Sequence, residues 1–207
     1  MSIAAITFMQ SLSGTLFPVF DYMIIDFGAK GLQASAFRLE VYKQLQTLSH
    51  AYTREMSGDA INDILFQHFE PFVREAWVTK QNASISDEGQ SKFYQSTMQN
   101  LRNTVHQMKT QTNTASDIVG TVTLIPTDED IEVRLTQSEF ESLVRKDLKQ
   151  WIKSTVESAL KQASEVCSNL NLQYVRWTGG SSLLPLFQNI VKEFFRNLGM
   201  LYLFHLS

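Results

Sequence analysis

Two short segments of the sequence carry residue types that can bind phosphate. They are residues 26–31 (DFGAKG) and 178–181 (TGGS), and each follows an apolar run typical of a buried strand. Glycine at a strand end lets backbone N–H groups approach an anion, and a helix just after the second segment would add its positive N-terminus. Each segment alone is also compatible with a plain glycine turn. As a pair, they are a stronger signal of phosphate binding than either segment alone.

The elements that must position these segments follow from the spacing of apolar residues. The predicted strands span residues 21–27, 32–39, 41–51, 117–125, 130–136 and 174–180. The predicted helices run from 57 to 77 with an N-cap at Ser57 and a kink or break at Pro71, over 91–112, from Thr136 to about Cys167, and over 181–197. Thr136 and Glu139 have the spacing of a capping box. This order favours an α/β or α+β fold over a helical bundle.

Composition narrows the class of protein. The chain has 207 residues, 43% of them hydrophobic and 19% charged, which is typical of globular domains. The net charge of −3 gives no general basic field for nucleic acid. The single cysteine, Cys167, excludes an internal disulfide framework. No apolar run reaches the roughly 20 residues that span a bilayer, and the N-terminus lacks the basic residues of a signal peptide. We therefore expect neither nucleic acid nor membrane as partner.

Four segments follow one another in an order that matches a known family. Residues 26–31 (DFGAKG), 56–62 (MSGDAIN), 135–143 (LTQSEFESL) and 178–185 (TGGSSLLP) stand where that family has Asp-Leu-Gly-Gly-Gly-Thr, Leu-Gly-Gly-Glu-Asp-Phe-Asp, Ile-Thr-Arg-x-x-Phe-Glu-x-Leu and Val-Gly-Gly-Ser-Thr-Arg-Ile-Pro. The chain thus resembles the second lobe of the actin-like ATPase domain of the heat-shock protein 70 family.

The resemblance implies a fold and a domain plan. It implies an α/β, ribonuclease H-like lobe II with a mixed sheet and helices, plus an inserted helical and β subdomain at about 57–166. The lobe would cover residues 21–196. Residues 1–20 remain unassigned, and 197–207 form a tail without a match.

The resemblance also assigns roles in the first segment. Asp26 would position a metal-bound water and phosphate, as the catalytic carboxylate, although an aspartate here can also simply end a strand. Gly28, Ala29, Lys30 and Gly31 would form the phosphate loop. Gly31 replaces the family threonine, so a hydroxyl is lost; Lys30 either offers a charge to phosphate or is a solvated turn lysine.

A helix segment would face the adenosine. His106, Lys109, Thr110 and Asn113 match that stretch of the family. Lys109 keeps the family lysine, Thr110 replaces an adenine-stacking arginine, and His106 replaces a ribose-binding glutamate. A histidine such as His106 is more often a surface residue of a helix than a ligand.

The second segment completes the implied adenosine site. Gly179, Gly180 and Ser181 fit the family, whereas Leu183 replaces a second stacking arginine. Loss of stacking on both arginines predicts that nucleotide affinity falls about ten- to hundred-fold. No protein ligand to a metal is assigned.

The implied function is a partial ATP-binding domain of a heat-shock-70-type chaperone in protein folding, with ATP or ADP and Mg²⁺ as cofactors. Because phosphoryl transfer depends on groups from both sides of a cleft, and the first lobe lies outside the matched region, we do not expect the chain alone to hydrolyse ATP. The alternatives are a non-catalytic exchange partner of another chaperone and a non-functional truncated product. Expected partners are a family chaperone and unfolded clients.

Residues 26–37 and 106–113 look most like the large stress-response members of the family in the endoplasmic reticulum. This likeness implies a lumenal location, with cytoplasm as the alternative.

Overall fold

The computed structural model describes residues 19–40, 45–81, 88–112 and 116–200, which divide into two compact units. The first unit holds the described residues up to Gly58 and from Asp147 onward, and the second holds Asp59–Lys146. The second unit is therefore an insertion between the two parts of the first unit. The sequence placed the insertion at about 57–166, whereas the compact second unit ends at Lys146, within the long helix.

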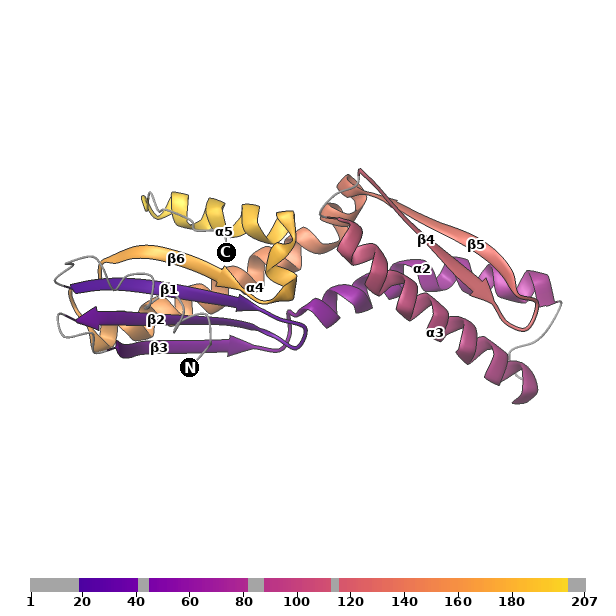
Figure 1. Cartoon of the computed structure of the whole chain (residues 1–207), viewed down its shortest axis with the longest axis horizontal. Coiled ribbons are helices and arrows are strands. Elements are labelled where there is room, and N and C mark those ends of the chain that lie inside the picture. The colour runs from indigo at the N-terminus through magenta and orange to yellow at the C-terminus, as the bar shows by residue number, and fades with distance from the viewer. Residues whose placement is uncertain (1–18, 41–44, 82–87, 113–115, 201–207) are drawn as a thin grey trace. The chain divides into compact units, whose positions relative to one another are not determined.

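The first unit is built on a four-stranded sheet (Figure 1). Its strands are β1 (Val19–Phe27), β2 (Leu32–Glu40), β3 (Leu45–Thr53) and β6 (Leu172–Thr178). Their order is β3-β2-β1-β6. The first three strands are antiparallel, whereas β6 is parallel to β1. The predicted α/β class with a mixed sheet is confirmed.

Both faces of the central strand β1 are buried, as its apolar sequence requires. Phe20, Tyr22 and Ile24 pack with Phe37 of β2 on one face. On the other, Phe27 stacks on Phe187 of the last helix with ring centroids 4.9 Å apart. Each large apolar side chain removed from water contributes about 1.5–3 kcal/mol, so β1 is the centre of this unit.

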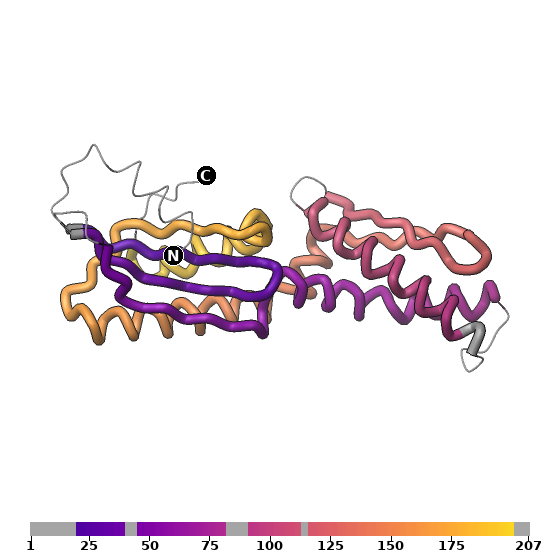
Figure 2. Tube along the Cα trace, turned by 60° about the horizontal axis from the view of Figure 1, so that its bottom comes forward, coloured from indigo at the N-terminus to yellow at the C-terminus, as the bar shows by residue number. Residues whose placement is uncertain are grey.

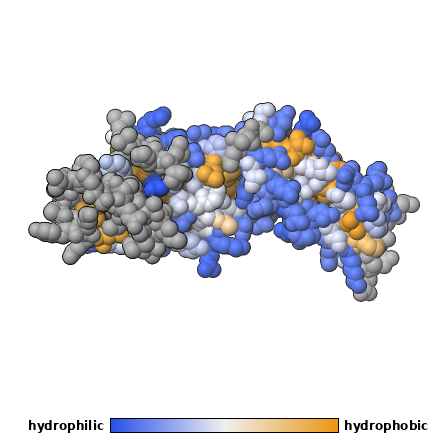
Figure 3. All heavy atoms as spheres, viewed as in Figure 1, coloured by the Kyte–Doolittle hydropathy of each residue, from blue (hydrophilic) through white to orange (hydrophobic). Residues whose placement is uncertain are grey.

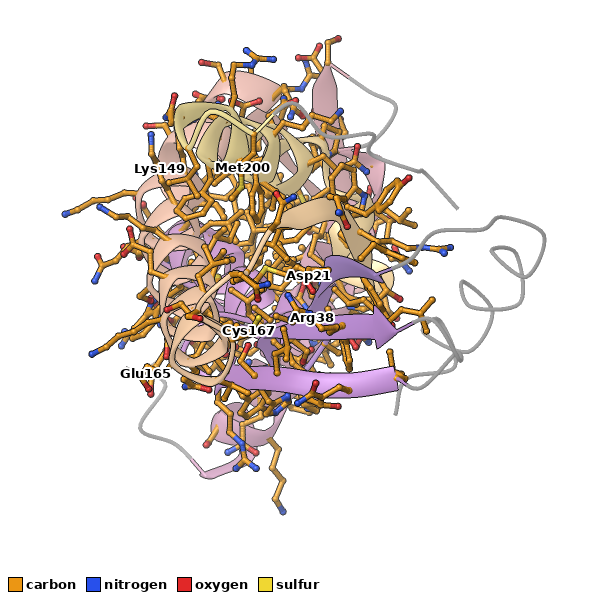
Figure 4. The ribbon with its side chains drawn as sticks, turned by 90° about the vertical axis from the view of Figure 1, so that its left-hand side faces the viewer. Asp21, Arg38, Lys149, Glu165, Cys167 and Met200 are labelled. Atoms are coloured by element: carbon orange, nitrogen blue, oxygen red, sulfur yellow. The ribbon has the colours of Figure 1, made fainter. Side chains whose placement is uncertain are left out.

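Helices α4 (Gln137–Val166) and α5 (Pro185–Asn197) supply the helical part of the first unit, α4 with its residues from Asp147 onward. Lys149 Nζ and Glu193 Oε1 join them at 2.7 Å, and Figure 4 shows Lys149 beside α5. The same view labels Asp21 and Arg38, whose bidentate ion pair (2.7 and 2.8 Å) lies at the start of β1. The other end of β1, which carries Asp26, is thus left for the glycine segments.

The second unit contains α2 (Gly58–Gln81), α3 (Glu88–Gln111), the hairpin β4 (Asp117–Leu124) and β5 (Glu129–Thr136), and the start of α4 (Figure 2). The predicted break at Pro71 is wrong, since α2 is one continuous helix; the kink stays a prediction. Val73 and Trp77, two and six residues beyond Pro71, are fully buried, and Trp77 Nε1 donates to Ile125 O at 2.8 Å. This packing keeps the helix going where one backbone bond is lost.

The beginnings of the last two helices differ in how well the sequence predicts them. The capping box is confirmed, because the Thr136 N–H donates to Glu139 Oε2 at 2.8 Å and the Glu139 N–H to Thr136 Oγ1 at 3.2 Å. The helix predicted over 181–197 starts later. A 3₁₀ turn, η1 (Gly180–Leu183), comes first, and the extended Leu184 leads into Pro185 at the first helical turn.

Figure 3 shows hydrophilic residues over much of the visible face, with smaller apolar patches between them. Among the described helices, none combines the length and the low charge needed to cross a membrane.

Candidate functional site

The parallel pairing of β1 with β6 brings the two glycine segments together. Asp26 is opposite Thr178 in the register, so both strands end at the same edge of the sheet. A Cβ atom on Gly179 would lie 2.4 Å from Asp26 Oδ1 and 2.5 Å from Phe27 O. We call residues 26–31 the first corner and residues 178–183 the second corner. They are adjacent in space although far apart in the chain.

The first corner is a tight connection between β1 and β2. The Gly28 N–H donates to Gly31 O at 3.0 Å and closes the turn. Gly28 O in turn accepts the N–H of Gly58, the first residue of α2, at 2.9 Å. Ala29 and Lys30 are exposed at the tip, so their backbone is accessible to a ligand.

Asp26 is the acidic group of this edge. Its side chain is half-buried, and burial raises the pKa of its carboxyl above the ordinary 3.8. A desolvated carboxylate is stabilised by a nearby cation, which would lower the pKa again. Asp26 is therefore suited to hold a cation or a cation-bound water beside the turn.

The second corner depends on the conformation of Gly179. Its φ of 93° is strained for any other residue. The N–H and the Oγ of Ser182 both donate to Gly179 O, at 3.0 and 2.7 Å. A Cβ atom added at Gly180 would have no neighbouring heavy atom within 4 Å. The predicted ligand residue Ser181 is only 6% exposed, whereas Leu183 is 59% exposed.

The predicted adenosine residues on α3 lie in the second unit and have different surroundings. Lys109 is buried, and burial lowers the pKa of its amine while Asp59 opposes that shift. His106 is exposed, with Nδ1 3.3 Å from Asn62 Nδ2. Thr110 is exposed, and its Oγ1 donates to Gln107 O of its own helix at 2.6 Å. Asn113 lies outside the described residues.

A polar hollow of about 380 Å³ lies between α2 and α3 and includes His106. Asp59, Asn62 and Arg102 contribute to its wall. The sequence analysis did not single out these residues. Asp59 could have been found from the sequence, because it directly follows the glycine that begins α2. Asn62 and Arg102 look like ordinary polar positions of amphipathic helices.

A metal ion at the corners would be held mainly by the phosphates of a bound nucleotide. No three histidine, cysteine, aspartate or glutamate side chains cluster suitably for a metal within the described ranges. Mg²⁺ that bridges phosphates keeps several waters and takes one or two carboxylates. Asp26 is the only acidic residue of the two corners, and it fits that requirement.

Comparison with known proteins gives one clear match. The family model described as Hsp70 protein matches residues 21–199. The matched region includes both corners, the polar hollow and every described candidate residue. No curated protein matches the chain.

Proposed function

Because the chain belongs to the Hsp70 family and contains a chaperone-type ATP-binding domain of actin-like fold, we propose that its two corners bind the phosphates of ATP or ADP with Mg²⁺. Ala29, Lys30 and Gly31 would face the phosphates from the first corner, and Gly180 from the second. Asp26 would hold a water of the Mg²⁺ shell. When bound, the ion would neutralise phosphate charge.

The observation that carries this proposal is the contact between the corners. A Cβ on Gly179 would collide with both Asp26 Oδ1 and Phe27 O. Glycine here allows the backbone of one corner to lie directly against the carboxylate of the other. Accessible backbone next to a desolvated carboxylate is an arrangement that a phosphate with its cation satisfies, since N–H groups bind the anion and the carboxylate binds the cation.

We further propose that binding is weak and that the chain alone does not turn ATP over. Gly31 offers no hydroxyl, and neither Thr110 nor Leu183 provides the guanidinium that stacks on adenine. The described corners also contain one positively charged side chain, Lys30. Phosphoryl transfer needs charge stabilisation around the transferred group, and these corners offer little of it.

Isothermal titration of the chain with Mg·ATP tests the proposal. We expect saturable binding in the micromolar to millimolar range that Asp26→Asn and Gly180→Val abolish. Gly180→Val is the sharper variant, because the open space at Gly180 accommodates a side chain that then blocks the phosphate. Glu165→Gln, an exposed site on α4, is the control and should bind normally. A wild-type chain that shows no heat up to millimolar nucleotide would contradict the proposal.

A second candidate function is a non-catalytic partner of another chaperone, acting in nucleotide exchange. The observation that favours it is Leu183, an apolar side chain 59% exposed at the second corner, where it suits contact with protein. Pull-down of a purified Hsp70-family chaperone, followed by measurement of its ADP release rate, separates the two functions. Faster release with Leu183 intact, and not with Leu183→Ser, would support this candidate.

We also propose the large endoplasmic-reticulum branch of the family and a lumenal location. The support is the likeness of residues 26–37 and 106–113 to those members. Fractionation of cells that produce the protein tests the location, and recovery with cytoplasmic markers would contradict it.

A further inference from the structure

Tyr52, near the end of β3, occupies the space next to the first corner. Its side chain is 49% exposed, and its Oη donates a hydrogen bond to Lys30 O at 3.2 Å. A Cβ on Gly31 would lie 2.5 Å from Tyr52 Cε2 and 2.7 Å from Tyr52 Oη. The tyrosine ring therefore fills the position that a side chain at residue 31 would need.

The bond to Lys30 O fixes the orientation of a peptide plane. In a trans peptide the C=O and the next N–H point in opposite directions. With Lys30 O directed at the Tyr52 hydroxyl, the Gly31 N–H points away from that hydroxyl. By the same geometry, the bond from the Gly58 N–H to Gly28 O turns the Ala29 N–H away from Gly58. Two donors from outside the turn thus orient its peptide planes.

The geometry points to Tyr52 as a positioning residue that holds the turn in its anion-accepting conformation. This inference rests on the proposed function, because it names the group that prepares the phosphate loop. Tyr52 gives its proton to Lys30 O, so its oxygen has no proton left to donate to a phosphate. Tyr52 acts through the backbone of residues 29–31, and together with Thr53 O it takes up the space that a side chain at residue 31 would need.

The first test compares Tyr52→Phe with wild type in binding ADP, adenosine and pyrophosphate with Mg²⁺. The variant keeps the ring and loses one hydrogen bond, so ADP and pyrophosphate should bind about two- to tenfold more weakly. Adenosine lacks the phosphates, and its affinity should stay unchanged. Equal weakening of ADP and adenosine, or no weakening of either, would overturn the inference.

The second test does not need a nucleotide. Backbone ¹⁵N relaxation should show residues 29–31 as ordered in wild type and with a lower order parameter in Tyr52→Phe, moving from about 0.85 toward 0.6. Unchanged order in the variant would overturn the inference. If wild type binds no nucleotide, the proposed function fails, and this measurement still decides the role of Tyr52.

A pair of substitutions tests the steric part. Gly31→Thr alone should lower the melting temperature, because the new side chain meets the tyrosine ring and Thr53 O, the latter at 2.7 Å. The loss caused by Gly31→Thr should be smaller in a Tyr52→Gly background than in wild type, since the ring is gone and Thr53 O remains. An equal loss in the two backgrounds would show that Tyr52 is not the obstacle and would overturn this part.

Discussion

The two corners lie at one edge of the same sheet, but they are held in different ways. The first corner is oriented by donors from outside the turn, the Tyr52 hydroxyl and the Gly58 N–H. The second is held by the two hydrogen bonds of Ser182 and by Gly179, whose positive φ and missing side chain let it lie against the end of β1.

The difference lies in what blocks a side chain at each glycine. Gly31 faces the half-exposed side chain of Tyr52 and also the backbone of Thr53, whose O would lie 2.7 Å from an added Cβ. Gly179 faces the carboxylate of Asp26 and the backbone of Phe27. Gly179 in addition has a positive φ, which Gly31 does not. A substitution at Gly179 therefore meets backbone strain as well as crowding, whereas part of the obstacle at Gly31 is a side chain that can be exchanged.

The largest effect expected from this comparison is that of Gly179→Ala. An alanine at φ 93° is strained, and its Cβ would lie 2.5 Å from Phe27 O. Backbone strain and overpacking each cost about 1–3 kcal/mol, so urea unfolding should show a combined loss of about 2–6 kcal/mol.

Gly180→Ala is the matched control, since nothing lies within 4 Å of its Cβ position. Its free energy of unfolding should change by less than about 1 kcal/mol. Equal losses at the two glycines would mean that the second corner is not held by the contact of Gly179 with β1.

A smaller loss is expected from Ser182→Ala. The Ser182 Oγ is in a residue only 3% exposed and donates to Gly179 O at 2.7 Å. Removing one buried hydrogen bond costs about 0.5–1.5 kcal/mol, measured by thermal or urea unfolding. Tyr52→Phe at the first corner should cost less, because its hydroxyl is near solvent and water can replace it. A larger loss for Tyr52→Phe would reverse the comparison.

Asp26→Asn should change stability in the opposite direction. Burial raises the pKa of Asp26 above its ordinary 3.8. The folded state thus favours the neutral carboxyl, and wild type loses stability as pH rises from 3.8 through the raised pKa. At pH 7 the neutral asparagine variant should unfold at a higher temperature than wild type, and this difference should shrink toward pH 3.8. A variant less stable than wild type at pH 7 would show that the charged carboxylate is stabilised by its neighbours.

Much of the fold could be predicted from the sequence because its signals are local. Strand alternation and helical spacing depend on residues a few positions apart, and the Thr136–Glu139 box is a single turn long. The edge where the corners meet could be predicted only through the family resemblance, because the pairing of Asp26 with Thr178 joins distant segments. The α/β class and the family are confirmed; the individual ligand roles stay predictions.

The features that the sequence did not reveal depend on packing. The continuity of α2 through Pro71 follows from buried residues such as Trp77. The delay of α5 to Pro185 follows from the turn that Ser182 closes on Gly179. The place of Tyr52 against Gly31 joins two strands. A local pattern contains none of these contacts, so propensity alone predicts a break at Pro71 and an earlier start of α5, and gives Tyr52 no role.

The smallest effect on stability, and the most informative on binding, is expected for Leu183→Arg. The side chain is 59% exposed, so the free energy of unfolding should change by less than about 0.5 kcal/mol. A guanidinium at this position could stack on a bound base, and a gain of ~1–2 kcal/mol raises ATP affinity about five- to thirty-fold. Leu198→Arg is the control. Leu198 is 48% exposed and lies just beyond the other end of α5, so this substitution adds the same charge away from the second corner. Titration with Mg·ATP should show the gain for Leu183→Arg alone. An equal gain for both variants would mean that general charge attracts the nucleotide, and the second corner would then have no specific part in holding the base.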